Sequence, residues 1–154
     1  MYRFRIYADT SVIGGCLDKE FAIESQMFMQ RVRKGKYQLL LSETVLRELE
    51  GAPKAVRDIV SSVPVQYVEM LDLTEQVIHL RDAYLDAGVV TRKWMDDATH
   101  VALATVARSD AIVSWNFKHI VQLDKMKAYN QVNLLHGYGI LTIVTPKEVV
   151  RTHG

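Results

Sequence analysis

The sequence predicts an α/β fold in a single domain, residues 1–154, built as a three-layer α/β/α sandwich around a central, mostly parallel sheet. Apolar segments of strand length alternate along the chain with amphipathic segments of helix length. Strands that alternate with helices indicate a parallel sheet covered on both faces. A length of 154 residues suits one domain with a layered core, and no repeat or Pro/Gly-rich linker divides it.

The first strand is expected over residues 4–8, where apolar and polar side chains alternate before Asp9. Arg3 and Arg5 fit poorly in a central parallel strand, which should be apolar on both faces. We therefore expect both arginines at the exposed beginning of this strand.

A helix is expected next, over residues 21–34, because its apolar positions recur with helical spacing and Gly35 can end it. Residues 37–41 have the composition of a buried strand. Ser42 can cap a helix over residues 43–50.

Pro53 suits the first turn of a further helix that runs to about residue 61. Residues 63–70 are expected to form the third strand, although Pro64 interrupts it near its start. A threonine cap and a following glycine enclose a helix over residues 74–87.

The last part of the chain continues the alternation. An Ala-rich helix is expected over residues 96–108, a short strand over 111–115 and a helical region over 117–135. Residues 140–144 form the last expected strand, and Pro146 begins a short terminal helix.

Composition excludes several classes of protein. The net charge of +1 argues against a protein that coats nucleic acid by bulk electrostatics. The single cysteine, Cys16, excludes an intramolecular disulfide. No apolar run is long enough to span a membrane, and the first residues lack the apolar stretch of a signal peptide. Together these features predict a cytoplasmic protein with no membrane partner.

Three acidic residues stand where such a sheet would bring them together. Asp9 follows the first strand, Glu48 lies in the helix after the second, and Asp97 opens the helix before the fourth. The active crevice of an open α/β sheet lies beyond the carboxyl ends of its strands. Clustered carboxylates repel one another unless a hard cation is present, and such sites usually hold Mg²⁺ or Mn²⁺ for chemistry on phosphates. The residues therefore predict a metal-dependent nuclease.

Alternatives stay open at the first two positions. Asp9 could equally cap the turn that follows it. Glu43 and Glu50 are also candidates for the second carboxylate, and a solvated helix face explains any one of them. Glu48 is preferred because it lies beside the apolar stripe of its helix, one turn beyond Val45.

The third position is also ambiguous. Asp96 and Asp97 both lie in a first helical turn, where the macrodipole favours negative charge. Their side chains point about 100° apart, so one can face a crevice while the other faces solvent. The local sequence does not choose between them. Nearby, Trp94 and Trp115 could each stack a nucleic-acid base, although packing is the better prediction for both.

Other chemistries fit less well. A phosphoacceptor signalling domain needs an acidic pair after the first strand, but Tyr7 and Ala8 precede Asp9. A haloacid-dehalogenase-like phosphatase needs a second Asp two residues after the first, where this chain has Ser11. No Cys/His or Ser/His/Asp arrangement and no Gly-rich phosphate loop competes with the carboxylates.

Four runs carry a resemblance to a known family. They are DTSVIGG after the first strand, SETVLREL after the second, DDATHVALATVA, and DAIVSWNFKHI. In this order they resemble the PIN-domain family, particularly the small single-domain ribonucleases of the VapC toxin type. The resemblance covers nearly the whole chain and includes the final ILTIVTPKEVV.

The resemblance implies a set of site residues. Asp9, Glu48 and Asp97 match the family's three carboxylates and would hold the metal, and Ser114 matches a hydroxyl residue that follows the fourth strand. Asn116 stands where the family often has a further acid, which leaves three carboxylates for one or two cations. With the three carboxylates, Asn116 completes the catalytic set that we predict.

The implied activity is that of a Mg²⁺- or Mn²⁺-dependent endoribonuclease that hydrolyses phosphodiester bonds in RNA. A VapC-type protein would be the toxin of a toxin-antitoxin pair. Its partners would be the RNA substrate, a small antitoxin protein and a second copy in a homodimer. The alternative is a non-catalytic PIN-like RNA-binding or scaffold domain, which the uncharged Asn116 suggests.

Overall fold

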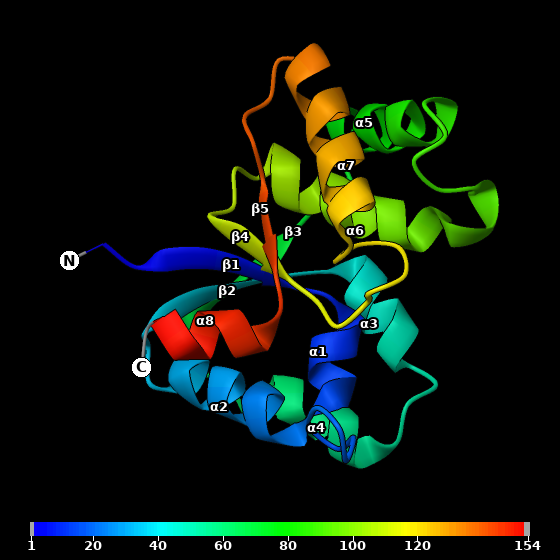
Figure 1. Cartoon of the computed structure of the whole chain (residues 1–154). Helices are drawn as coiled ribbons and strands as arrows, with labels where there is room; N and C mark the ends of the chain where they lie inside the picture. The colour runs from blue at the N-terminus through cyan, green and yellow to red at the C-terminus, as the bar shows by residue number, and fades with distance from the viewer. Residues whose placement is uncertain (1, 153–154) are drawn as a thin grey trace.

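The computed structural model describes residues 2–152 and contains a five-stranded sheet in which all paired strands are parallel. The strands are β1 (Phe4–Ala8), β2 (Tyr37–Ser42), β3 (Val68–Leu71), β4 (Ala111–Val113) and β5 (Thr142–Val144), in the spatial order β3-β2-β1-β4-β5. Helices flank the sheet on both faces (Figure 1), which confirms the predicted α/β/α fold class. Within the described part of the chain, no helix is long and apolar enough to cross a membrane.

The helices divide into two groups. They are α1 (Thr10–Gly15), α2 (Ala22–Arg33), α3 (Glu43–Leu49), α4 (Lys54–Ser61), α5 (Glu75–Asp86), α6 (Met95–Val106), α7 (Leu123–Leu135) and α8 (Pro146–Thr152). Helices α5, α6 and α7 lie on one side of the sheet, and α1, α2, α4 and α8 lie on the other (Figure 1). Helix α3 contacts both α1 and α6, so it links the two helical layers.

Strand β1 is the central strand of the sheet. It pairs with β2 on one side and with β4 on the other. Tyr7, Leu40 and Ile112, one from each of these strands, are fully buried. Because the strand order reverses at β1, a crevice is expected beyond the carboxyl ends of β1 and β4. Asp9 is the first residue beyond β1.

The two arginines near the start of β1 are accommodated differently. Arg3 is exposed, as expected, whereas Arg5 is half-buried. The Arg5 guanidinium donates to the Glu69 carboxylate at 2.7 Å and to the Ala107 carbonyl at 2.7 Å. These partners satisfy the donors of a charged side chain in a central strand, which explains why the strand tolerates it.

The short helix α1 is absent from the sequence-based prediction. Thr10, Ser11 and two glycines make up most of it, and these are weak helix formers without an apolar period. Asp9 begins the helix, because its side chain accepts the Ser11 backbone N–H at 3.1 Å. The capping role considered for Asp9 is therefore confirmed.

The strand predicted over residues 63–70 is wrong in its first half. Pro64 precedes a 3₁₀ turn over Val65–Tyr67, and the Tyr67 N–H donates to the Pro64 carbonyl at 2.9 Å. Proline cannot donate to a sheet ladder, so pairing with β2 begins only at Val68.

The strand predicted over residues 111–115 ends two residues early. After Val113 the chain turns toward α1, where the Trp115 N–H donates to the Ser11 hydroxyl at 2.8 Å. This hydrogen bond replaces a continued sheet ladder at the carboxyl end of β4.

The helical region predicted over residues 117–135 starts later than expected, at Leu123. The Asn116 side-chain oxygen accepts the backbone N–H groups of Lys118 and His119 at 3.2 and 2.9 Å and holds a tight turn instead. Asparagine side chains compete with helical hydrogen bonds in this way.

The last strand, predicted over residues 140–144, begins only at Thr142. Asn130 on α7 explains the difference, because its amide group bonds the Leu141 backbone in both directions, at 2.7 and 3.1 Å. Leu141 therefore pairs with a side chain rather than with β4.

Candidate metal centre

Asp9 is the most deeply buried carboxylate of the predicted set, with 4% of its surface exposed. One of its oxygens accepts the Ser11 hydroxyl at 2.6 Å and the other accepts the Ser114 hydroxyl at 2.5 Å. Burial raises the pKa of Asp9, and these hydrogen bonds oppose the rise. Asp9 follows β1 and Ser114 follows β4, so the hydrogen bond between them connects the carboxyl ends of the two central strands.

Glu48 approaches this region from α3. Its Oε1 accepts the Thr10 hydroxyl at 2.7 Å and contacts the His100 Nε2 at 2.6 Å. The side chain is 30% exposed, and its second oxygen has no hydrogen-bond partner within residues 2–152. Glu43 and Glu50 line a different hollow, so of these three acids Glu48 is the one that lines the crevice.

A buried hydrogen-bonded chain runs behind Glu48, and the sequence analysis missed it. The His100 Nδ1 contacts the Tyr7 hydroxyl at 2.7 Å, and that hydroxyl contacts the Ser42 hydroxyl at 2.8 Å. His100 and Tyr7 have 2% and 0% of their surface exposed. A histidine in a run of Ala and Val indicates a buried partner, but the partner lies on another element and cannot be read from this run alone.

The contact between Glu48 and His100 favours the charged form of each group. Burial works against both charges, but the hydrogen bond and the charge of His100 bring the pKa of Glu48 below its usual value. Likewise, burial lowers the pKa of His100, but the hydrogen bond to Glu48 and the negative charges of Asp9, Glu48 and Asp97 raise it above its usual value. A protonated His100 would offset part of the negative charge of the site.

Asp97 and Asp96, which the sequence left unresolved, have different surroundings. Asp96 forms an exposed ion pair with Arg47 at 2.8 Å. Asp97 is half-buried, and the nearby Asn116 side chain works to lower its pKa. Burial raises the pKa of Asp97, and the nearby charge of Asp9 adds to the rise. These contacts favour Asp97 as the residue that faces the other two carboxylates.

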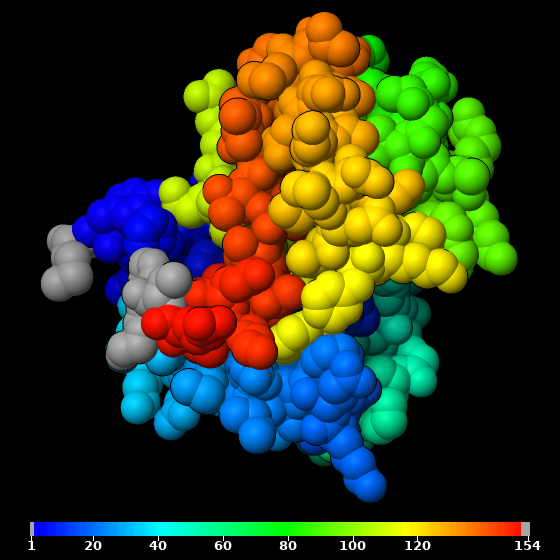
Figure 2. Space-filling model, viewed as in Figure 1, coloured from blue at the N-terminus to red at the C-terminus, as the bar shows by residue number. Residues whose placement is uncertain are grey.

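Most of the predicted site residues line one cavity of about 460 Å³. Its lining consists of Glu48, Lys93, Trp94, Asp96, Asp97, Asn116, Lys118 and His119. Asp9 is not part of this lining and is almost fully covered, although its charge acts on both Asp97 and His100. In Figure 2 the yellow segment after β4 and the teal α3 lie on either side of a small dark-blue area of the N-terminal segment.

The donor chemistry of these residues fits a hard divalent cation. Carboxylate and amide oxygens are the ligands that Mg²⁺ and Mn²⁺ prefer. Two neighbouring carboxyls with raised pKa values would gain from a nearby positive charge. Among residues 2–152, however, no three His, Cys, Asp or Glu side chains are grouped as a ready set of metal ligands.

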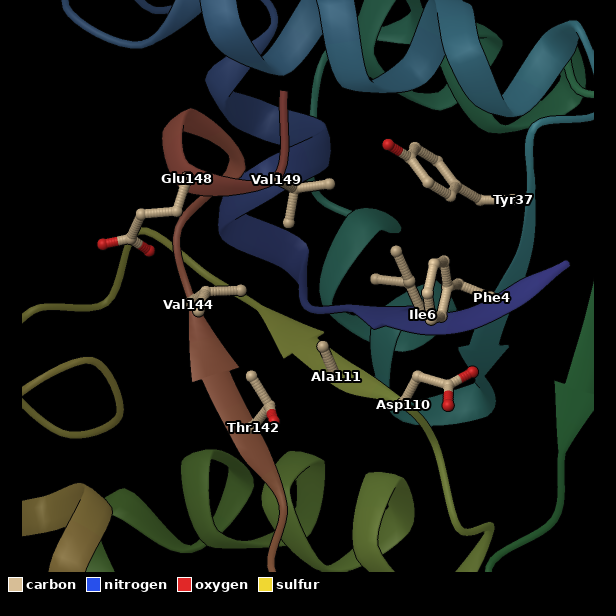
Figure 3. Close-up of a pocket in the computed structure, with 9 residues that line it drawn as sticks. All are labelled: Phe4, Ile6, Tyr37, Asp110, Ala111, Thr142, Val144, Glu148 and Val149. Carbon is tan, nitrogen blue, oxygen red and sulfur yellow. The ribbon is translucent and has the colours of Figure 1, made fainter. Parts of the chain in front are cut away.

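A second hollow, of about 230 Å³, lies at the opposite end of the sheet (Figure 3). Its lining is mostly apolar and includes the first residues of β1, β4 and β5. Asp110 borders it and accepts the Arg5 backbone N–H at 2.8 Å. The predicted site residues do not line this hollow.

Comparison with protein-family models and with curated proteins finds no significant match for this chain. The resemblance to the PIN-domain family therefore stays a prediction that rests on the sequence runs described above. The structure independently supplies the class of fold and the position of each candidate residue within it.

Proposed function

We propose that this protein is a Mg²⁺- or Mn²⁺-dependent endoribonuclease that resembles the PIN-domain ribonucleases. One observation carries the proposal: Glu48, Asp97 and Asn116 line one cavity at the carboxyl ends of the central strands, and the buried Asp9 lies close enough to act on Asp97. Such a position is where open α/β sheets bind their ligands. The basic side chains of Lys93 and Lys118 line the same cavity and suit a phosphate-containing substrate.

Each residue has a distinct part in the proposed chemistry. Asp9, Glu48 and Asp97 would hold the cation, which supplies a water of lowered pKa and neutralises charge that develops on the phosphate oxygens. Ser11 and Ser114 fix the Asp9 carboxylate by donating hydrogen bonds to it.

The remaining groups position the other two carboxylates. Thr10 and His100 fix Glu48, and the Asn116 side chain lies beside Asp97 in the same cavity. Such supporting contacts typically change metal affinity or activity by about 10- to 100-fold when they are removed.

The wider role follows from the same resemblance. The protein would act in the cytoplasm as the toxin of a toxin-antitoxin pair, with a small antitoxin as its inhibitor and a second copy as its homodimer partner. RNA would be its substrate. Co-expression of the neighbouring reading frame, followed by co-purification and a cleavage assay, tests this role.

One observation favours a second candidate, a non-catalytic PIN-like RNA-binding or scaffold domain. The Oε1 atom of Glu48 already has two partners, Thr10 and His100, at 2.7 and 2.6 Å. A Glu48 fully committed to these contacts would leave the cation with two carboxylates. Metal titration separates the candidates, because a scaffold domain would bind RNA without Mn²⁺ and would not cleave it.

The direct test combines RNA cleavage with thermal unfolding. Cleavage of a single-stranded RNA should require Mg²⁺ or Mn²⁺ and stop when the metal is chelated. Mn²⁺ at about 100 times its Kd should add roughly 2.7 kcal/mol to the free energy of unfolding, because it binds only the native protein. For a domain of this size that corresponds to a rise in Tm of about 5–10 °C. Cleavage that persists in EDTA would contradict the proposal.

Replacement of Asn116 tests how many cations bind. Asn116→Asp adds a negative charge beside Asp97 and should strengthen a second Mn²⁺ binding event by roughly tenfold or more. Calorimetric titration measures both events. Gln122→Glu, which adds the same charge at an exposed residue outside the cavity lining, is the matched control. Two equally tight sites in the unmodified protein, or no change in Asn116→Asp, would show that Asn116 is not at the metal centre.

A further inference from the structure

Two aromatic rings are stacked in the wall of the candidate cavity. Trp94 lies in a 3₁₀ turn, Arg92–Trp94, just before α6, and His119 lies in the turn after β4. Their ring centroids are 4.3 Å apart and their planes differ by 29°. Both rings line the cavity that contains Asp97 and Asn116. The stack therefore lies beside the position at which a phosphate would be bound.

The His119 side of the stack is firmly held. The His119 backbone N–H donates to the Asn116 side chain at 2.9 Å, and its carbonyl accepts the Tyr129 hydroxyl at 2.9 Å. Its Nε2 is buried and has no hydrogen-bond partner among residues 2–152. The imidazole ring therefore stacks on Trp94 and forms no hydrogen bond through Nε2 to another described residue.

The two tryptophans of the chain differ in their surroundings. Trp115 is 8% exposed, stacks on Phe21 at 4.3 Å, and donates its indole N–H to Ser25 at 2.7 Å. These contacts are those of a packing residue. Trp94 is only half-buried and lines the cavity instead. The exposed Lys93 ammonium lies 5.1 Å from the centroid of its ring.

A stacked pair with an accessible ring in a nuclease cavity is suited to a third planar ring. Bases of a duplex are already stacked on their neighbours, whereas an unpaired base gains by stacking on a protein aromatic ring. Lys93 is exposed and flexible, so it can leave the Trp94 ring to a base and approach a backbone phosphate.

We propose that Trp94, supported by His119, is a stacking platform that holds one unpaired base beside the candidate metal centre. The substrate class is then a single-stranded segment of nucleic acid rather than a duplex. This inference rests on the proposed nuclease function, because it assigns a place to the base that adjoins the cleaved phosphate.

Fluorescence of Trp94 provides the test. In the variant Trp115→Phe, Trp94 is the one tryptophan left, because the chain has two. This variant is titrated in EDTA with a six-nucleotide RNA, with the same sequence in a duplex, and with a strand of abasic residues. The single strand should quench the emission, and the duplex and the abasic strand should not. If Trp115→Phe does not fold, the unmodified protein serves, since its Trp115 is buried.

Affinity measurements on Trp94 variants provide the second arm. Trp94→Tyr keeps an aromatic face and should bind the single strand within a few-fold of the unmodified protein. Trp94→Leu keeps an apolar side chain without a π-face and should bind about 5- to 100-fold more weakly, as expected for the loss of one stacked base. Equal affinity of the Leu and Tyr variants, or equal quenching by strand and duplex, would overturn the platform.

The two proposals fail in different ways. Binding is measured in EDTA, and cleavage is measured separately with Mn²⁺. Quenching in EDTA without any cleavage in Mn²⁺ would support the platform and contradict the nuclease. Cleavage with an unchanged KM in Trp94→Leu would leave the nuclease intact and overturn the platform. A matching DNA strand that quenches equally well would support stacking and show that the ring does not select the sugar.

Discussion

Asp9→Asn is expected to lower metal-dependent RNA cleavage by about 100-fold or more. Loss of a residue that only supports a metal ligand typically costs about 10- to 100-fold, and loss of a ligand itself should exceed that. Cleavage rates at saturating Mn²⁺, together with the Mn²⁺ dependence of Tm, measure the effect. The rise in Tm caused by Mn²⁺ should shrink in parallel with the activity, because both depend on the same carboxylate.

The fold should survive this substitution. Asn retains a side-chain oxygen that can accept the Ser11 N–H, so the cap of α1 is preserved. Asp18→Asn is a matched control, since Asp18 also accepts a backbone N–H two residues further on, from Glu20 at 2.8 Å, but is exposed and outside the cavity lining. Full metal-dependent cleavage by a folded Asp9→Asn protein would rule out the proposed centre.

Asp97→Asn should lose activity by a similar factor, whereas Asp96→Asn should remain close to the unmodified protein. Asp97 lines the cavity with Asn116, and the charge of Asp9 raises its pKa, so on the proposed function neutralising Asp97 would remove a ligand. Asp96 is paired with Arg47 at 2.8 Å on an exposed surface. Losing that pair and its helix-terminus interaction should change the free energy of unfolding by only a few tenths to about 1 kcal/mol.

The adjacent pair is its own control, because both changes remove one negative charge from the same helical turn. Cleavage rates and denaturant unfolding should be measured on both variants. If Asp96→Asn is inactive and Asp97→Asn is active, then Asp96, which also lines the cavity, is the ligand and must leave Arg47 to bind the metal.

Much of the fold could be predicted because the strands are short apolar runs between amphipathic helices. What could not be predicted depends on contacts between distant residues. Helix α1 has weak helix formers, but Asp9 caps it, and Gly15 lets it approach α2 and the segment after β4. A Cβ on Gly15 would lie 2.7 Å from the Ser25 hydroxyl and 3.0 Å from the Trp115 indole nitrogen.

The candidate site, like the fold, could be predicted from the sequence only in part. A carboxylate after the first strand could be found from sequence, because strand ends are recognisable. Choosing between Asp96 and Asp97 required the position of Arg47, which lies on α3, far away in the chain. The buried chain from Glu48 through His100 to Tyr7 combines three elements, so no local pattern contains it.

The central position of β1 has a consequence for the order in which the protein can mature during translation. Strand β1 is made before its partner β4 and the turn that contains Asn116, which follow about 100 residues later. At roughly 5–20 residues per second this interval lasts about 5–20 s. A nascent chain that has reached only β3 contains Asp9 and Glu48 without Asp97. On the proposed function, a growing chain would therefore be harmless to RNA near the ribosome, and an inhibitor of the crevice would have its target only after α6 and the turn that follows β4 have been made.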